Sequence, residues 1–86
     1  METAFPAPLI LAADDSPDSL AMLVELLRME DYRVITAADG VRALEVAQQQ
    51  LPDMILLDVM MPGLDGFVVC QALKQDERFQ KVPVIF

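Results

Sequence analysis

Four short runs of apolar and β-branched residues mark the chain. They cover residues 9–13, 32–37, 54–57 and 82–86, and polar or turn-forming residues separate them. A short apolar run without strict alternation is typical of a strand buried on both faces, as in a parallel sheet. β-branched residues favour the same assignment for 32–37. We therefore predict four strands at these positions.

Between these runs, apolar residues recur every three or four positions, which predicts amphipathic helices. The first helix is expected over 17–29, because Asp15 or Ser16 can cap it and Pro17 suits its first turn. A second is expected from residue 41 to the glutamines at 48–50, and a third from residue 67 to about 73. Strands that alternate with helices predict an α/β fold with a parallel sheet and right-handed crossovers.

The chain is long enough for one small domain, with residues 1–8 as a leader and 9–86 as the core. The leader contains Glu2 and no basic residue, so it does not resemble a signal peptide. The apolar run at 9–13 is too short to span a bilayer. A single cysteine, Cys70, suits a reducing compartment. We expect a cytoplasmic protein.

Charge and composition exclude several classes of function. The chain has 14 acidic and 6 basic residues, for a net charge of -8. Nucleic acids and anionic membranes repel such a chain, so neither is an expected partner. The chain has no histidine, which excludes Ser-His-Asp triads, Cys-His pairs and most zinc sites. It also cannot itself carry a phosphohistidine.

Three aspartates stand where predicted strands end. Asp14 and Asp15 follow the first strand, and Asp58 follows the third. In open α/β sheets the carboxyl ends of the strands form the functional edge, and neighbouring strands lie about 4.8 Å apart. Three converging carboxylates repel one another unless a cation neutralises them, and Mg²⁺ is the natural partner. One of them can also act as a nucleophile.

Each part of this pattern also has a purely structural interpretation. Asp-Asp-Ser-Pro by itself is typical of a capped helix start, and Asp58 by itself of a turn. The glycines at 63 and 66 by themselves indicate ordinary turns in the loop at 60–66. The combination of an acid pair after the first strand with a lone acid after the third favours the functional interpretation.

Two segments resemble the signatures of response-regulator receiver domains: Ile-Leu-Ala-Ala-Asp-Asp-Ser-Pro at 10–17 and Ile-Leu-Leu-Asp-Val-Met-Met-Pro-Gly-Leu-Asp-Gly at 55–66. Phe67 and the closing Val-Pro-Val-Ile-Phe fit the same family. The resemblance implies a flavodoxin-like, doubly wound parallel sheet with strand order 2-1-3-4-5.

The resemblance also implies the roles of the site residues. Asp58 would be the phosphoacceptor, and Asp14 and Asp15 the acidic pair that binds Mg²⁺. The backbone carbonyl of Met60 would be a further metal ligand. A sensor histidine kinase or phosphotransfer protein would donate the phosphoryl group.

The sequence departs from the family after the fourth strand. Complete receivers continue with a Ser or Thr, a helix, a fifth strand that ends in a Lys, and a last helix. We therefore interpret the chain as a receiver truncated to strands 1–4 and helices 1–3 of a (βα)₅ fold. Lys74 and Lys81 lie in or after the third helix, so neither is assumed to replace the missing lysine.

This interpretation predicts the behaviour of the fragment. We expect weak Mg²⁺ binding, impaired phosphorylation, no switching, and self-association through the exposed fourth strand.

Other classes of protein share parts of this pattern. A degenerate receiver that serves only as an interaction module stays open. An aspartate-nucleophile, Mg²⁺-dependent phosphohydrolase would carry a second acid two residues after Asp58, where Met60 stands. A dinucleotide-binding fold would need a glycine-rich loop after the first strand, and this chain has none there. We therefore expect a signalling domain, not an enzyme.

Overall fold

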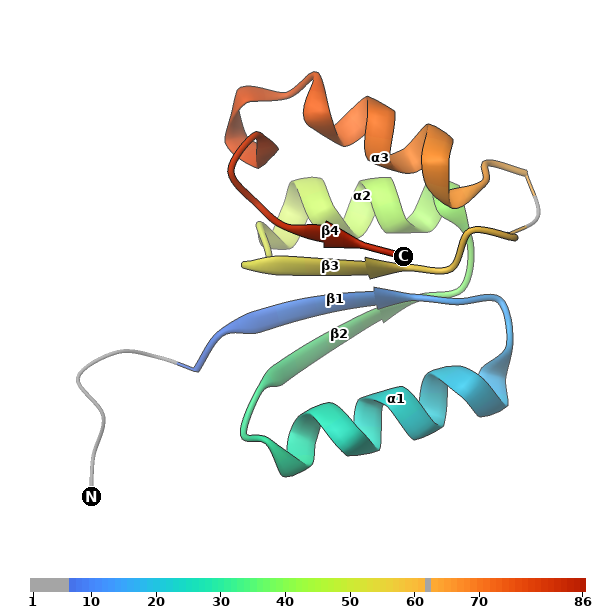
Figure 1. Cartoon of the computed structure of the whole chain (residues 1–86), viewed down its shortest axis with the longest axis vertical. Helices are drawn as coiled ribbons and strands as arrows, with labels where there is room; N and C mark the ends of the chain where they lie inside the picture. Colours follow the sequence, from blue (N-terminus) through green and yellow to red (C-terminus); the bar gives the residue numbers. More distant parts are fainter. Residues whose placement is uncertain (1–6, 62) are drawn as a thin grey trace.

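The computed structural model describes residues 7–61 and 63–86. Four parallel strands form one sheet in the order β2-β1-β3-β4 (Figure 1). Their bounds are Leu9–Ala13 (β1), Arg33–Ala37 (β2), Met54–Leu57 (β3) and Val84–Ile85 (β4). The predicted α/β fold with a parallel sheet is confirmed. Most of the predicted leader and the first residue of the predicted turn at 62–63 lie outside the described residues.

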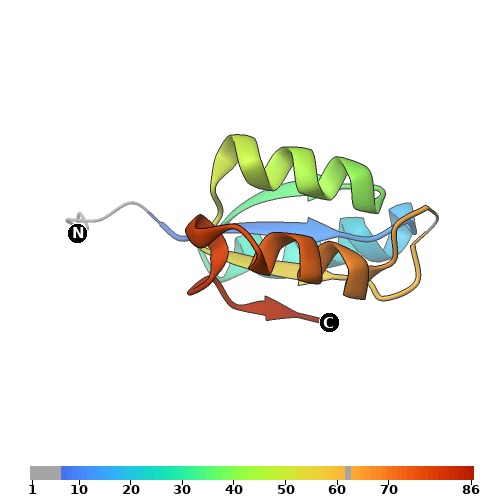
Figure 2. The same cartoon turned by 90° about the horizontal axis from the view of Figure 1, so that it is seen from above.

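Three α-helices cover the sheet, and they are distributed unequally. α2 (Gly40–Gln50) and α3 (Gly66–Lys74) lie side by side on one face, and α1 (Pro17–Met29) lies on the other (Figures 1 and 2). A short 3₁₀ helix, Glu77–Phe79, connects α3 to β4. The sequence pattern did not predict this last element.

Each α-helix begins where a polar side chain caps it. Ser16, Asp39 and Asp65 precede α1, α2 and α3. In each case the side-chain oxygen accepts a hydrogen bond from the backbone N–H three residues later, at 3.3, 2.8 and 2.9 Å respectively. Such caps satisfy N–H groups that have no partner within the helix. The Asp65–Gly66 pair, expected as loop, is instead the cap and first residue of α3.

The core lies between the sheet and the α2–α3 layer. Its buried members are Leu11, Ala13, Ala37, Ala43, Val46, Ala47, Ile55, Leu57, Met61, Val69, Leu73 and Phe79. Helix α1 contributes no buried residue. Phe79 is 1% exposed, so the 3₁₀ helix places a large aromatic ring in the core.

The fourth strand is shorter than predicted. Only Val84 and Ile85 pair with β3, at Ile55 and Leu56. The backbone groups of Val82 are used elsewhere: its N–H donates to Phe79 O at 3.1 Å, and its carbonyl accepts from Lys74 Nζ at 2.6 Å. The predicted strand over 82–86 is therefore wrong in its bounds, and Pro83 precedes the strand.

The second strand begins one residue later than predicted. The N–H of Tyr32 donates to the carbonyl of Leu27, at 3.2 Å, and so belongs to the turn that ends α1. Asp31 in that turn has a φ of 65°. In the described part of the chain, no helix is long and apolar enough to cross a membrane.

Candidate functional site

Strand register brings the aspartates together at the carboxyl edge of the sheet. Ala13 of β1 is paired with Leu57 of β3, so the next residue of each strand is an aspartate. The N–H of Asp58 donates to Ala13 O at 2.8 Å, and the N–H of Asp14 donates to Ala37 O at 3.1 Å. Backbone pairing therefore continues to the site and fixes both acids.

Two of the carboxylates are oriented by their own loops. Oδ1 of Asp14 accepts from the N–H of Ser16 at 2.9 Å. Oδ1 of Asp58 accepts from the N–H of Met60 at 3.2 Å. This bond to the N–H two residues later is characteristic of aspartate in a turn. Each acid thus has one oxygen held by the backbone, and no hydrogen bond within residues 7–61 and 63–86 engages its other oxygen.

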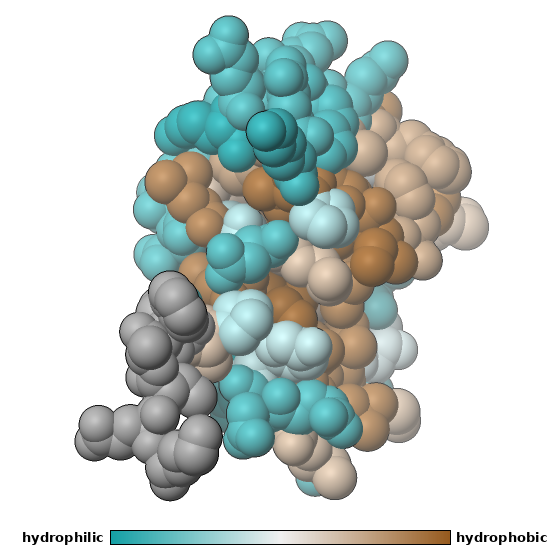
Figure 3. Space-filling view, turned by 60° about the vertical axis from the view of Figure 1, so that its left-hand side comes forward, coloured by the Kyte–Doolittle hydropathy of each residue, from teal (hydrophilic) through white to brown (hydrophobic). Residues whose placement is uncertain are grey.

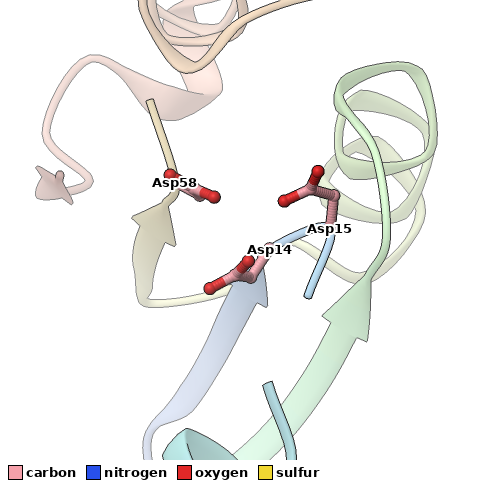
Figure 4. Close-up of side chains that lie close together, drawn as sticks. All are labelled: Asp14, Asp15 and Asp58. Atoms are coloured by element: carbon pink, nitrogen blue, oxygen red, sulfur yellow. The ribbon is translucent and has the colours of Figure 1, made fainter. Parts of the chain in front are cut away.

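The three acids form one compact cluster. Asp14, Asp15 and Asp58 each offer a carboxylate oxygen, and these atoms lie within 4.8 Å of one another. Figure 4 shows Asp15 and Asp58 turned toward each other, with Asp14 beside them at the end of its strand. Asp14 and Asp58 are half-buried, and Asp15 is exposed. The predicted convergence of these side chains is confirmed.

No basic side chain neutralises this cluster within the described residues. The two ion pairs formed there join Arg42 to Glu45 and Arg78 to Asp76. Three carboxylates at this separation repel one another. A hard cation with a preference for oxygen relieves that repulsion.

The spacing of the acids suits a small divalent ion. Oxygens on opposite sides of Mg²⁺ lie about 4.2 Å apart, because each bond is about 2.1 Å long. Adjacent oxygens lie about 3.0 Å apart in the same octahedral geometry. The three carboxylate oxygens lie within 4.8 Å of one another, so side-chain rotation would bring them into this range. The donor set, three carboxylates in an open site, therefore fits Mg²⁺.

Two hollows meet at the cluster. One, of about 430 Å³, is lined on its polar side by the three aspartates with Ser16 and Ser19, and on its apolar side by Leu23, Leu56, Ile85 and Phe86 among others. The other, of about 610 Å³, is lined by Asp15, Val59, Met60, Met61, Asp65 and Phe67. Met60, whose carbonyl was expected to be a further metal ligand, thus lines the same hollow as Asp15. A larger hollow of about 770 Å³ along α1 and β2 contains none of the three aspartates.

Gly66 determines how closely α3 approaches the site, although the sequence indicated only a turn at this residue. A Cβ atom on Gly66 would meet the carbonyl oxygen of Asp58 at 2.6 Å and Cα of Val59 at 3.0 Å. Its N–H donates to Val59 O at 3.0 Å. The first turn of α3 therefore packs on the backbone that carries Asp58. The signal was the Asp65–Gly66 pair directly before an apolar helix.

Lys74 is not directed at the cluster. Its Nζ donates to the carbonyls of Phe79, Gln80 and Val82, in the segment between α3 and β4. In Figure 1 this segment lies at the opposite end of the sheet from the carboxyl end of β3. Lys74 therefore offers no hydrogen bond to the three aspartates in this structure.

Comparisons with known proteins agree with the fold. The response regulator receiver domain family matches residues 10–86. The chain is 50% identical over 76 residues to response regulator PleD of Caulobacter vibrioides, covering 88% of this chain and 17% of that protein. It is 46% identical over 79 residues to the transcriptional regulator RpaA of Synechocystis, covering 91% of this chain and 32% of that protein.

Solved structures give the same result. Chemotaxis response regulator CheY4 of Vibrio cholerae superposes with a TM-score of 0.88 at 36% identity, covering 91% of this chain and 65% of that one. The receiver domain of a Pseudomonas aeruginosa sensor histidine kinase, with a magnesium ion coordinated in its active site cleft, gives a TM-score of 0.86 at 33% identity. There the match covers 91% of this chain and 64% of that one. The chain thus spans less than two thirds of these relatives, and it belongs to the response-regulator receiver domain family.

Proposed function

We propose that Asp58 accepts a phosphoryl group in a Mg²⁺-dependent reaction. Asp14, Asp15 and Asp58 would hold the ion through their carboxylates, and Met60 through its backbone carbonyl. The observation that carries this proposal is the cluster of three carboxylates, with oxygens within 4.8 Å, at the carboxyl edge of a receiver-family sheet. Asp58 is the member of the cluster that ends the central strand β3.

The reaction is a transfer between two side chains. A carboxylate oxygen of Asp58 attacks phosphorus in a phosphoimidazole, the P–O bond forms, and the P–N bond breaks with its electron pair leaving on the imidazole nitrogen. The amide of Met60 holds Oδ1 of Asp58 and thereby fixes the carboxylate for attack. Bound Mg²⁺ supplies neutralisation of negative charge on the transferring oxygens.

The phosphodonor is a phosphohistidine outside these 86 residues, because they contain no histidine. A sensor histidine kinase or a phosphotransfer protein would carry it. The domain acts as a signalling module in the cytoplasm. Its acidic charge of -8 disfavours direct contact with nucleic acid or an anionic membrane.

Mg²⁺ titration tests the metal site. We expect saturable binding in the wild type and about tenfold or greater weakening, about 1.4 kcal/mol, in Asp14→Asn and in Asp58→Asn. Asp31→Asn is the matched control, because it removes the same charge from an exposed turn residue with a φ of 65° that asparagine also adopts. Binding that is unchanged in both site variants would contradict the proposal.

We also propose that the chain self-associates through β4. This strand is at the edge of the sheet, with Ile85 47% exposed and Phe86 52% exposed. A band of hydrophobic surface runs between hydrophilic regions in Figure 3. Exposed apolar strand edges recruit other chains. Light scattering should show dimers or larger species that Ile85→Lys reduces, and a wild type that stays monomeric at high concentration would refute the idea.

A further inference from the structure

Lys74 forms a set of hydrogen bonds that the proposed phosphotransfer does not require. Its Nζ donates to three backbone carbonyls, Val82 at 2.6 Å, Phe79 at 3.0 Å and Gln80 at 3.4 Å. The lysine is half-buried, and an ammonium group has three donors and no acceptor. All three donors are therefore matched to carbonyls of the segment that leads into β4.

Strand β4 depends on this segment for its placement. The strand has two residues, lies at the sheet edge, and pairs only with β3. Directly before the strand, Pro83 O accepts from the N–H of Ile55 at 3.0 Å. Pro83 follows Val82, whose carbonyl Lys74 holds most closely. A strand this short gains little from its own pairing.

The far end of β4 borders the acid cluster. Ile85 and Phe86 line the hollow of about 430 Å³ that contains Asp14, Asp15 and Asp58. Phe67 lies in the first turn of α3, and the centroid of its ring is 4.7 Å from the ring centroid of Phe86. That turn begins at Gly66, which packs on the backbone of Asp58.

Helix α3 therefore holds β4 at two points. Lys74, at the end of the helix, binds the segment before the strand, and Phe67, at its beginning, contacts the residue after it. We propose that Lys74 is a positioning residue for the phosphoacceptor site. By fixing the entry of β4, it sets the apolar wall beside Asp58 against which a transferring phosphoryl group would lie. This inference rests on the proposed function, since it names a wall of the same site.

The test compares Lys74→Met with Lys81→Met. Both remove one positive charge from the same region, but Lys81 is exposed and forms no hydrogen bond or ion pair among the described residues. Mg²⁺ affinity should stay within about twofold of wild type in both, because the metal ligands are untouched. Binding of beryllofluoride, a mimic of the phosphoryl group, should weaken about fivefold or more in Lys74→Met only.

Hydrogen exchange of the Ile55 amide gives a second readout that does not require phosphorylation. This N–H is bonded to Pro83 O, so it reports whether β4 is docked. Its exchange should accelerate about tenfold in Lys74→Met and remain unchanged in Lys81→Met. Equal beryllofluoride affinity and equal exchange in the two variants would overturn the role of Lys74.

Two further results separate the proposals. A wild type that binds neither Mg²⁺ nor beryllofluoride overturns the proposed function, and the exchange comparison then decides whether Lys74 positions β4 at all. If Lys74→Met does not fold, Lys74→Gln keeps N–H donors at this position without the positive charge. It should give an intermediate exchange rate, and a wild-type rate would count against the proposal.

Discussion

The two faces of the sheet are built differently. The face under α2 and α3 contains a cluster of buried side chains, with Leu73 1% and Val69 0% exposed. The face under α1 is less well packed, because α1 buries no residue completely and its Leu23 is only partly covered. Because burial of apolar area is the main favourable term in folding, most of the stability should come from the α2–α3 face.

The candidate site lies where the two faces meet. Asp58 belongs to the well-packed side, since Gly66 of α3 packs on its backbone. Asp14 and the exposed Asp15 lead into α1 on the less well packed side. The proposed nucleophile is thus on the well-packed side, and the proposed acidic pair leads into the side with less burial. This difference makes the two faces separable by mutation.

The largest expected contrast is between two leucines. Leu73→Ala should lower the free energy of unfolding by about 2–5 kcal/mol, because it leaves a cavity in the buried cluster. Leu23→Ala should lower it by roughly 1 kcal/mol, because solvent already reaches that side chain. Urea denaturation measures both. Equal losses would show that the two faces contribute alike.

A smaller effect is expected at two glycines of the β3–α3 side. Gly66→Ala should cost about 1–3 kcal/mol, because its methyl group meets the Asp58 carbonyl at 2.6 Å and the backbone must move. Gly63→Ala meets no atom within 4 Å, so only its φ of +82° opposes it, by about 1 kcal/mol.

The two glycine variants also distinguish an effect on stability from an effect on the geometry of the metal site. Gly66→Ala should also weaken Mg²⁺ binding, because it displaces the backbone of Asp58, and Gly63→Ala should not. Denaturation and Mg²⁺ titration of both variants check this. Unchanged Mg²⁺ affinity in a folded Gly66→Ala protein would mean that the approach of α3 does not shape the site.

The smallest effect is expected at the surface corner that leads Phe79 into the core. Hydrogen bonds from the Arg78 side chain, and then from its backbone N–H, hold the pKa of Asp76 below its usual range. A carboxyl with a lowered pKa in the folded state adds stability above its unfolded pKa, and that contribution is lost as the pH falls through the lower folded value.

Asp76→Asn should therefore flatten the loss of stability below about pH 4 and change little at neutral pH. Asparagine keeps the cap of the 3₁₀ helix while removing the ion pair with Arg78. Thermal unfolding at several pH values measures the slope. Identical slopes in the two proteins would show that the pair does not contribute to the packing of this corner.

The parts of the fold set by local sequence were predictable. Apolar runs predicted the strands, and helical spacing predicted the helices. Asp15 or Ser16 was expected to cap α1, and Ser16 does so. The convergence of Asp14, Asp15 and Asp58 followed because residues at the ends of neighbouring parallel strands share one edge.

The parts that depend on distant contacts were not predictable. The carbonyl of Val82, which the predicted strand included, accepts from Lys74 and does not pair with β3, and Phe79 of the 3₁₀ helix is buried in the core. The role of Gly66 depends on how closely α3 approaches Asp58. None of these contacts has a periodic signature in the sequence.

Phosphate incorporation tests the proposed role of Asp58 most directly. The protein is treated with a small phosphodonor and Mg²⁺, and the modified residue is located by peptide mass mapping. The account predicts slow incorporation of a single phosphoryl group, located on Asp58, absent from Asp58→Asn and retained in Asp31→Asn. A phosphoryl group on another residue, or incorporation that Asp58→Asn does not reduce, would contradict it.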